Sequence, residues 1–198
     1  GNDLLYYENL CKQGKNFANK IWNSYRLIES WKPDNKLSME PSSKIAIDWY
    51  ESKYKKTLSK INDEFKKFRI SHALMEIYKL IWDDFCSWFL EIIKPEKGKI
   101  DNYTYKKVKY FFERNLKILH PFMPFISEEI WHLLEKRNIN ESLIISSWPK
   151  VNDFDKLILE KFEYSKELIS QIRSARKNKS ISFKDSIKLI CSNQIDKE

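Results

Sequence analysis

The chain has 198 residues, of which 36 are Lys or Arg and 28 are Asp or Glu, so its formal net charge is +8. A positive surplus of this size favours a polyanionic partner such as a nucleic acid, or an anionic membrane surface. Only three glycines occur, although glycine is the usual residue of tight turns and phosphate-binding loops. This scarcity argues against a Rossmann sheet, a P-loop or a β-sandwich, and it predicts a mostly helical chain.

The three cysteines, Cys11, Cys86 and Cys191, are widely spaced and form no CxxC pair. We therefore expect free thiols in a reducing cytosol. We expect no metal site, because none of the three histidines stands at a zinc-ligand spacing. No stretch reaches the roughly 18 apolar residues of a bilayer-spanning helix, and no signal peptide opens the chain. The expected setting is cytoplasmic, without membrane attachment.

The first predicted helix runs from about residue 3 to residue 31. The segment 31–34 ends it, because the proline at its third position disfavours helix in the residue before it. Apolar residues recur on one face at the helical period, and the opposite face is polar. The inward stripe is Leu10, Phe17, Ile21, Tyr25 and Ile28, and the outward stripe is Lys12, Asn16, Asn19, Asn23 and Arg26.

The second helix is predicted to begin at an N-cap formed by Ser42 or Ser43 and to extend to about residue 68. The third, from 71 to about 93, is apolar around most of its circumference, which is typical of a central helix. We expect Ile77, Ile81, Phe85 and Trp88 near the centre of the bundle. The inward face of the second helix comprises Ile47, Tyr50, Tyr54, Leu58, Ile61, Phe65 and Phe68.

The fourth helix is predicted at about 101–119 and the fifth at 127–136, the latter packing Ile130, Leu133 and Leu134 inward. Residues 143–145 are expected to be extended. The last helix, at about 153–178, has Ile158, Phe162, Ile169 and Ile172 inward and a basic end.

Residues 186–190 alternate like a strand but have no partner strand in the chain, and a lone strand is unstable. The prediction is therefore an all-α helical bundle over residues 1–150. Residues 151–198 would form a long basic helix and the truncated start of a small α/β junction.

No catalytic pattern is present: GxSxG, HExxH, a Walker loop and GxGxxG are all missing. The adjacent carboxylates at 83–84 and 128–129 point about 100° apart on a helix, so they are interpreted as surface or interhelical pairs. The histidines are interpreted as structural. Most aromatic residues, including Trp82, Phe85, Trp88 and Phe112, are interpreted as core, whereas Phe17, Trp22 and Tyr25 stay open as base contacts.

Two polar surfaces are the best binding candidates. The asparagine-rich face of the first helix offers amides suited to base edges, and the basic end of the last helix offers charges suited to phosphates. From residue chemistry alone, an ordinary solvated face remains the alternative interpretation of each surface.

Four segments carry a family resemblance. Residues 14–23, GKNFANKIWN, resemble the GRNFxNKxWN segment that opens the anticodon-binding domain of valyl-tRNA synthetases. Residues 81–95, IWDDFCSWFLEIIKP, are similar to that family's W[DN]EFCxWYLExxKP helix. Residues 119–131, LHPFMPFISEEIW, are similar to its LHPFMPFITEEIW segment, and residues 172–176, IRSAR, resemble its IRxxR helix. The segments occur in the family's order and span essentially the whole chain.

The resemblance implies a part of a class I aminoacyl-tRNA synthetase that activates valine with ATP and Mg²⁺ and esterifies valine tRNA. The family's HIGH and KMSKS motifs, its editing domain and its coiled-coil arm are absent from this sequence. We therefore expect no catalytic residue and no cofactor in this chain, and we expect the isolated chain to have no enzymatic activity. The implied partners are valine tRNA and the catalytic domain of the same polypeptide, in a monomer.

The resemblance also suggests the tRNA contacts. Lys15 departs from the family's usual arginine and so lacks bidentate capacity. The leucine and isoleucine enzymes share a version of the PFxPFxxEEIW region, and a helical protein-interaction adaptor is a further alternative. Anticodon-side contacts are expected from Lys12, Lys15, Asn16, Lys20, Asn23 and Arg26, and backbone contacts from Arg173, Arg176 and Lys177.

Overall fold

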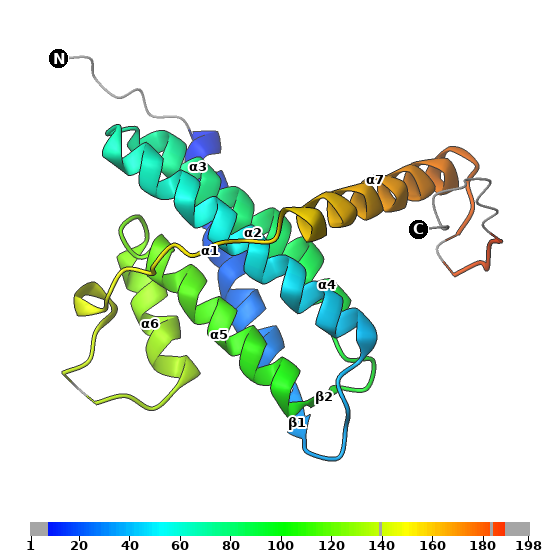
Figure 1. The fold of residues 1–198 in the computed structure, drawn as a ribbon, viewed down its shortest axis with the longest axis horizontal. Helices are drawn as coiled ribbons and strands as arrows, with labels where there is room; N and C mark the ends of the chain where they lie inside the picture. Colours follow the sequence, from blue (N-terminus) through cyan, green and yellow to red (C-terminus); the bar gives the residue numbers. More distant parts are fainter. Residues whose placement is uncertain (1–7, 139, 183, 189–198) are drawn as a thin grey trace. The chain divides into compact units, whose positions relative to one another are not determined.

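The structure is a computed structural model that describes residues 8–138, 140–182 and 184–188. It divides into two compact units, Gly1–Leu159 and Glu160–Glu198. The first unit is a helical bundle, as predicted (Figure 1). Its helical elements are α1 (Glu8–Glu29), α2 (Pro41–Lys66), α3 (Ile70–Lys79), the π-helix η1 (Leu80–Phe89), α4 (Leu90–Ile93), α5 (Asn102–Leu119), α6 (Pro124–Leu134) and the short 3₁₀ turn η2 (Leu143–Ile145).

The helices α2 and α6 begin earlier than predicted. Each starts at a proline, Pro41 or Pro124, rather than at the expected serine caps or at Ser127. Proline is well suited to the first helical position, because its fixed φ matches the helix and its missing N–H would have no partner there anyway.

The elements α3, η1 and α4 form one continuous helix whose middle turns are wider than an α-helix. Within them the Ser87 hydroxyl donates to the Trp82 carbonyl, five residues earlier, at 2.8 Å. Phe85 is fully buried as predicted, but Trp88 is partly exposed, and the fully buried Phe89 contributes to the centre instead. The prediction for Trp88 is wrong because it extended the 3.6-residue period through a π-helix, whose turns hold more residues.

The core is an aromatic cluster shared by α2, η1 and α5. The ring of Tyr50 lies 5.3 Å from that of Phe85, 4.8 Å from that of Phe89 and 5.2 Å from that of Phe111. Phe85 also stacks on Phe112 at 5.5 Å. The Tyr50 hydroxyl donates to Asn115 Oδ1 at 2.9 Å, and burial raises the pKa of Tyr50 well above its usual range. These tilted and offset ring contacts add to the free energy of burying the rings.

Two predicted inward positions and one predicted extended segment in this unit are wrong. Phe68 is 88% exposed, because α2 already ends at Lys66. Leu133 is 43% exposed, although Ile130 and Leu134 beside it are buried. Residues 143–145 form a 3₁₀ turn instead of an extended segment, and the Glu128 carboxylate accepts the Leu143 amide at 3.0 and 3.1 Å. The Leu10 side chain lies outside what the structure describes.

One small sheet accompanies the helices of the predicted all-α bundle. The strands β1 (Lys32–Asp34) and β2 (Lys99–Asp101) pair in parallel, with Pro33 opposite Ile100. Asp101 then caps α5, because its side chain accepts the Thr104 amide at 2.9 Å. The sheet therefore fixes where α1 ends and where α5 begins.

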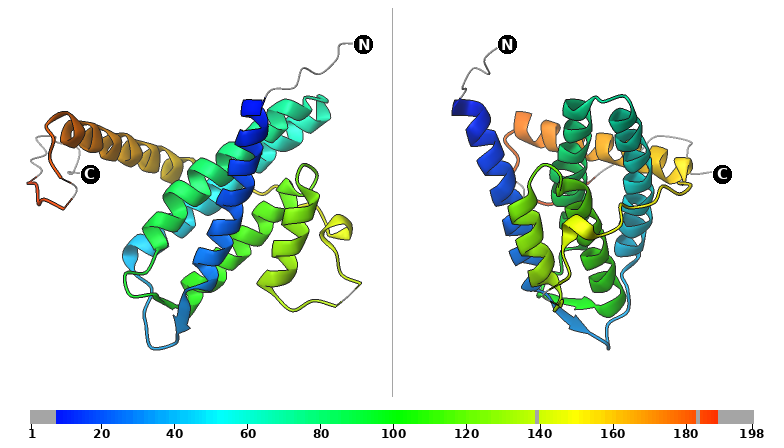
Figure 2. Two further views of the ribbon diagram at one scale, coloured as in Figure 1. Left: turned by 180° about the vertical axis from the view of Figure 1, so that it is seen from behind. Right: turned by 90° about the vertical axis from the view of Figure 1, so that its left-hand side faces the viewer.

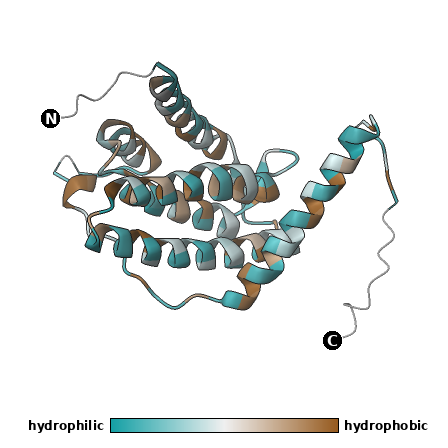
Figure 3. Cartoon of the chain, turned by 90° about the horizontal axis from the view of Figure 1, so that it is seen from above, coloured by the Kyte–Doolittle hydropathy of each residue, from teal (hydrophilic) through white to brown (hydrophobic). Residues whose placement is uncertain are grey.

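The helix α7 (Lys156–Asn178) starts in the first unit and makes up most of the described part of the second. Leu159 is buried, but Ile169, predicted to face inward, is 37% exposed. Hydrophobic residues are interspersed among hydrophilic ones along α7 (Figure 3). Residues 184–188 form neither helix nor strand, and the rest of the predicted strand, 189–190, lies outside the described residues. Among the described helices, none is long and apolar enough to cross a bilayer.

Candidate nucleic-acid interface

The helix α1 lies at the outside of the bundle, in front of the other helices when the molecule is seen from behind (Figure 2). Its inner face buries Phe17, Ile21 and Ile28, which are between 0% and 4% exposed. A buried contact of 3.1 Å between the Ser24 hydroxyl and the Cys86 sulfur ties the same face to η1. These contacts fix the rotation of α1, so its polar face must point to solvent.

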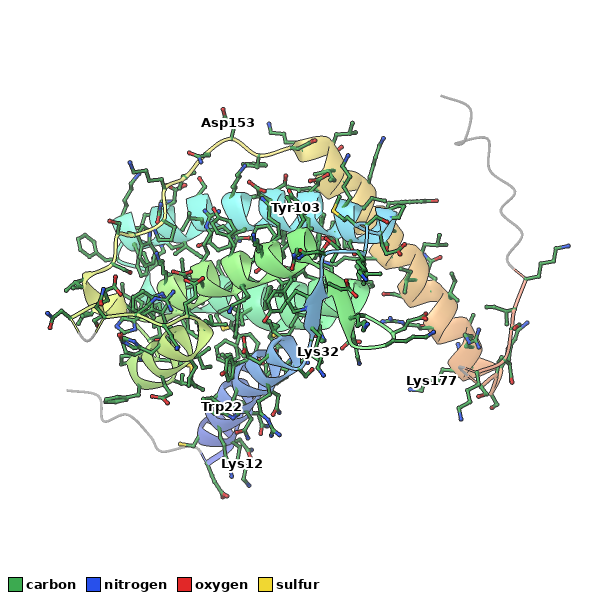
Figure 4. The ribbon with its side chains drawn as sticks, turned by 90° about the horizontal axis from the view of Figure 1, so that it is seen from below. Lys12, Trp22, Lys32, Tyr103, Asp153 and Lys177 are labelled. Atoms are coloured by element: carbon green, nitrogen blue, oxygen red, sulfur yellow. The ribbon has the colours of Figure 1, made fainter. Side chains whose placement is uncertain are left out.

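The predicted outward stripe of α1 does face solvent. Lys12 pairs with Glu8 at 2.9 Å, but the two side chains are 63% and 68% exposed. Such a pair contributes little free energy, so Lys12 can readily turn to another anion. Figure 4, in which Lys12 and Trp22 are labelled, shows side chains of α1 projecting away from the other helices. The exposed polar residues of this helix include Lys12, Lys15, Asn16, Asn19, Asn23 and Arg26.

The remaining α1 candidate, Lys20, is half-buried and lies over a pair of rings. Its ammonium lies 5.8 Å from the centre of the Trp82 ring, and Trp82 stacks on Tyr78 at 5.5 Å and an interplanar angle of 13°. Phe17 packs against Tyr78 at 4.7 Å but is only 4% exposed. Phe17 is therefore core and cannot stack on a base.

The sequence pattern did not predict the exposed Tyr78–Trp82 pair. Both rings are partly exposed beside α1, whereas Trp82 was predicted to be core and Tyr78 was given no role. The 3.6-residue period carried no signal for this exposure, because Trp82 stands in the π-helix. A ring pair with a lysine over it offers an aromatic face and a positive charge together.

Trp22 and Tyr25 remain open as base contacts. Trp22 is 36% exposed, and its ring lies 5.7 Å from that of Tyr25. Burial, followed by the nearby carboxylates of Glu29 and Glu129, raises the pKa of Tyr25 above its usual value. The phenol therefore stays protonated at neutral pH and can both donate and accept a hydrogen bond.

The basic end of α7 is less uniform than its spacing suggests. Arg173 and Lys177 are exposed, but Arg176 is half-buried. The Arg176 guanidinium donates to the carbonyl of Ser182 and, at 2.7 Å, to that of Asp185. Arg176 thus holds the loop that follows the helix, a role that the sequence spacing did not reveal. The α7 candidates belong to the second unit, separate from those of α1.

Several of the carboxylates and histidines elsewhere make contacts that support the fold. Asp84 is 5% exposed and pairs with Lys53 of α2 at 3.4 Å. His132 Nε2 lies 3.2 Å from Glu128, and His120 Nδ1 lies 2.8 Å from the Ser127 hydroxyl. Among the described residues, no group of three or more His, Cys, Asp or Glu could hold a metal ion.

The chain resembles known proteins over most of its length. A family described as the anticodon-binding domain of tRNA ligase matches residues 48–191. The chain is 50% identical over 188 residues to the valine–tRNA ligase of Christiangramia forsetii, covering 94% of this chain and 22% of that protein. It is 43% identical over 190 residues to the valine–tRNA ligase of Parabacteroides distasonis, covering 96% and 22%.

A more distant relative is aligned over the full length of the chain. The valine–tRNA ligase of Fusobacterium nucleatum is 32% identical over 211 residues, which cover 100% of this chain and 24% of that protein. The chain thus spans between a fifth and a quarter of the length of these curated relatives.

Proposed function

We propose that this chain, which belongs to the family of anticodon-binding domains of tRNA ligases, is the part of a valine–tRNA ligase that grips the anticodon arm of valine tRNA. The observation that carries the proposal is α1. Its inner face packs against η1 and α6, and its outer face exposes a row of amides and cations to solvent.

The two kinds of side chain on α1 suit two tasks. The amides of Asn16 and Asn23 can donate and accept together, as base edges require. Lys12, Lys15 and Arg26 can neutralise phosphates and so position the RNA without reading its sequence. Because α1 is rotationally fixed by its core contacts, the RNA would meet a preorganised surface.

The aromatic groups beside α1 suit the unpaired bases of an RNA loop. Trp22 offers a partly exposed ring on α1 itself, and the Tyr78–Trp82 pair offers a second platform with the Lys20 ammonium over it. Stacking on such rings is tolerant of sequence. Specificity would therefore rest on the asparagines, while the rings would stabilise the splayed loop.

The chemical steps would take place in the part of the ligase outside this chain. ATP and Mg²⁺ would be held there, because this chain has no nucleotide-binding motif. Valine activation and its transfer to tRNA are thus proposed for the whole enzyme, and RNA positioning for this chain. We further propose a monomer that acts in the cytosol.

Valine is favoured over leucine and isoleucine because the relatives described above are valine–tRNA ligases. A helical protein-interaction adaptor would not require an ordered row of asparagines facing solvent. It would bind all tRNAs alike, through net charge only.

Two double variants test whether α1 reads the bases and α7 neutralises the phosphates. Replacing Asn16 and Asn23 with Ala should leave the salt dependence of RNA binding nearly unchanged and should reduce discrimination against altered anticodons by about 1–3 kcal/mol. Replacing Arg173 and Lys177 with Ala should weaken binding to all tRNAs alike and should lower the salt slope by roughly one unit per lost contact. Both are measured by filter-binding titrations at several salt concentrations.

The matched control removes exposed amides elsewhere, at Asn140 and Asn152, and it should behave like the unaltered chain. If the two test variants shift affinity and salt slope identically, or if neither differs from the control, the assignment of base reading to α1 is wrong.

A further inference from the structure

The turn between α2 and α3 carries an exposed aromatic residue in an unfavourable backbone conformation. Phe68 is 88% exposed and has a φ of +56°. A bulky residue with positive φ is uncommon, because its Cβ crowds the backbone in the left-handed region. Such strain is found where a local requirement outweighs it.

The backbone around Phe68 explains the conformation but not the choice of residue. The Phe68 amide donates to the Phe65 carbonyl at 3.0 Å, and the Arg69 amide donates to the Glu64 carbonyl at 2.9 Å. This pair of bonds is a Schellman motif with Phe68 at the position where glycine is usually found. A ring that is almost fully exposed gains little from burial to offset the strain. Glycine would therefore serve the fold better than phenylalanine here.

Cations surround the exposed ring. The turn reads Lys66-Lys67-Phe68-Arg69, and all four residues are exposed. Lys66 lies 3.9 Å from Asp63, with side chains 79% and 57% exposed, so this ion pair is weak. An exposed ring among cations is the arrangement with which proteins hold unpaired nucleotides, the base stacking on the ring and the phosphates pairing with the cations.

We propose that Phe68 is a stacking platform for an unpaired base of bound RNA, with Lys66, Lys67 and Arg69 neutralising the phosphates on either side. This proposal rests on the proposed function and extends the RNA-binding surface beyond α1. Figures 1 and 2 place the α2–α3 turn at the same end of the bundle as the first turns of α1, which carry Lys12.

The charges decide between RNA and a protein partner. Covering the turn with an apolar protein surface would desolvate three cations without pairing them, which is strongly unfavourable. RNA pairs the same cations with phosphates, and the release of condensed counterions favours binding. The turn therefore fits a polyanion with exposed aromatic bases better than an apolar protein face.

The decisive variant is Phe68→Gly. Glycine relieves the strain at positive φ, so the variant should be at least as stable as the unaltered chain. It should nevertheless bind a hairpin RNA with the anticodon stem and loop of valine tRNA about 5- to 150-fold more weakly, the range for loss of one stacked base. With 2-aminopurine at loop positions, the quenching seen on binding to the unaltered chain should be lost at one position.

The matched control is Phe125→Ala. Phe125 is 91% exposed, but its neighbours Pro124 and Ile126 are uncharged, so its loss should leave RNA affinity unchanged. Phe68→Trp should retain binding, and Phe68→Leu, which keeps an apolar side chain without a ring, should lose it.

The outcomes separate this proposal from the proposed function. If the unaltered chain binds no RNA, both are wrong. If it binds RNA and Phe68→Gly binds equally well, the stacking role alone is wrong, and a docking surface for protein becomes the explanation of the exposed ring. If Phe68→Gly unfolds, the leucine and tryptophan variants decide: equal RNA affinity for the two overturns the proposal.

Discussion

Replacing Phe85 with alanine removes the ring at the centre of the aromatic core. Phe85 is 0% exposed, and its ring lies 5.3 Å from Tyr50 and 5.5 Å from both Phe89 and Phe112. The substitution forfeits the transfer free energy of the ring and leaves a cavity, a combined loss of about 3–5 kcal/mol. Because domains are typically stable by only about 5–15 kcal/mol, this loss is a large share of the total free energy of unfolding.

The measurement is urea unfolding followed by far-ultraviolet circular dichroism. With a slope of about 2 kcal/mol per molar urea, the midpoint should fall by about 2 M while the slope stays constant. The control Phe68→Ala removes an equally large ring that is 88% exposed, and its effect should stay within about 0.5 kcal/mol. A loss below about 1 kcal/mol for Phe85→Ala, at unchanged slope, would refute the assignment of η1 as the centre of the core.

Three further predictions concern titration and activity. Burial raises the pKa of Cys86 from 9.0 to about 11. The neutral thiol therefore contributes stability that is fully present below pH 9 and is lost as the pH rises towards 11. This loss of stability should be smaller in Cys86→Ala. Burial raises the pKa of Glu51, but Lys55 and Lys107 outweigh it and hold that pKa below its usual 4.5. Its contribution to stability is therefore lost as the pH falls through the lowered value, and Glu51→Gln should weaken this acid dependence, measured by urea unfolding at several pH values. Finally, the chain alone should neither exchange pyrophosphate with ATP in the presence of valine nor charge tRNA, and detectable exchange by the purified chain would contradict the absence of a catalytic site.

Most of the bundle could be predicted because its helices are long and strongly periodic. The buried stripe of α1 and the central position of Phe85 both follow from a 3.6-residue repeat. The same rule gave the wrong position for Trp88, since no sequence pattern marked the wider turns of η1. The same period also wrongly extended the inward face of α2 to Phe68, which lies beyond the end of that helix.

Features that depend on distant contacts could not be predicted. The pairing of β1 with β2 joins residues more than 60 positions apart and involves only three residues on each side, too few for a periodic signal. The position of Arg176 depends on the carbonyls of the loop that follows α7, which a charge pattern does not reveal. Lys20 and the Tyr78–Trp82 pair come together only when α1 packs on the continuous α3–η1 helix. The α1 stripe was predicted because it needs no information beyond its own helix.

The most direct test of RNA recognition is a comparison of dissociation constants for the chain at one fixed salt concentration. The ligands are valine tRNA, the same tRNA with its anticodon bases replaced, and a tRNA for another amino acid. We predict that valine tRNA binds most tightly and that each lost base contact costs about 1–3 kcal/mol, or roughly 5- to 150-fold in affinity. Equal affinity for all three RNAs would mean that the chain binds by charge alone, which would contradict the proposed role in reading the anticodon.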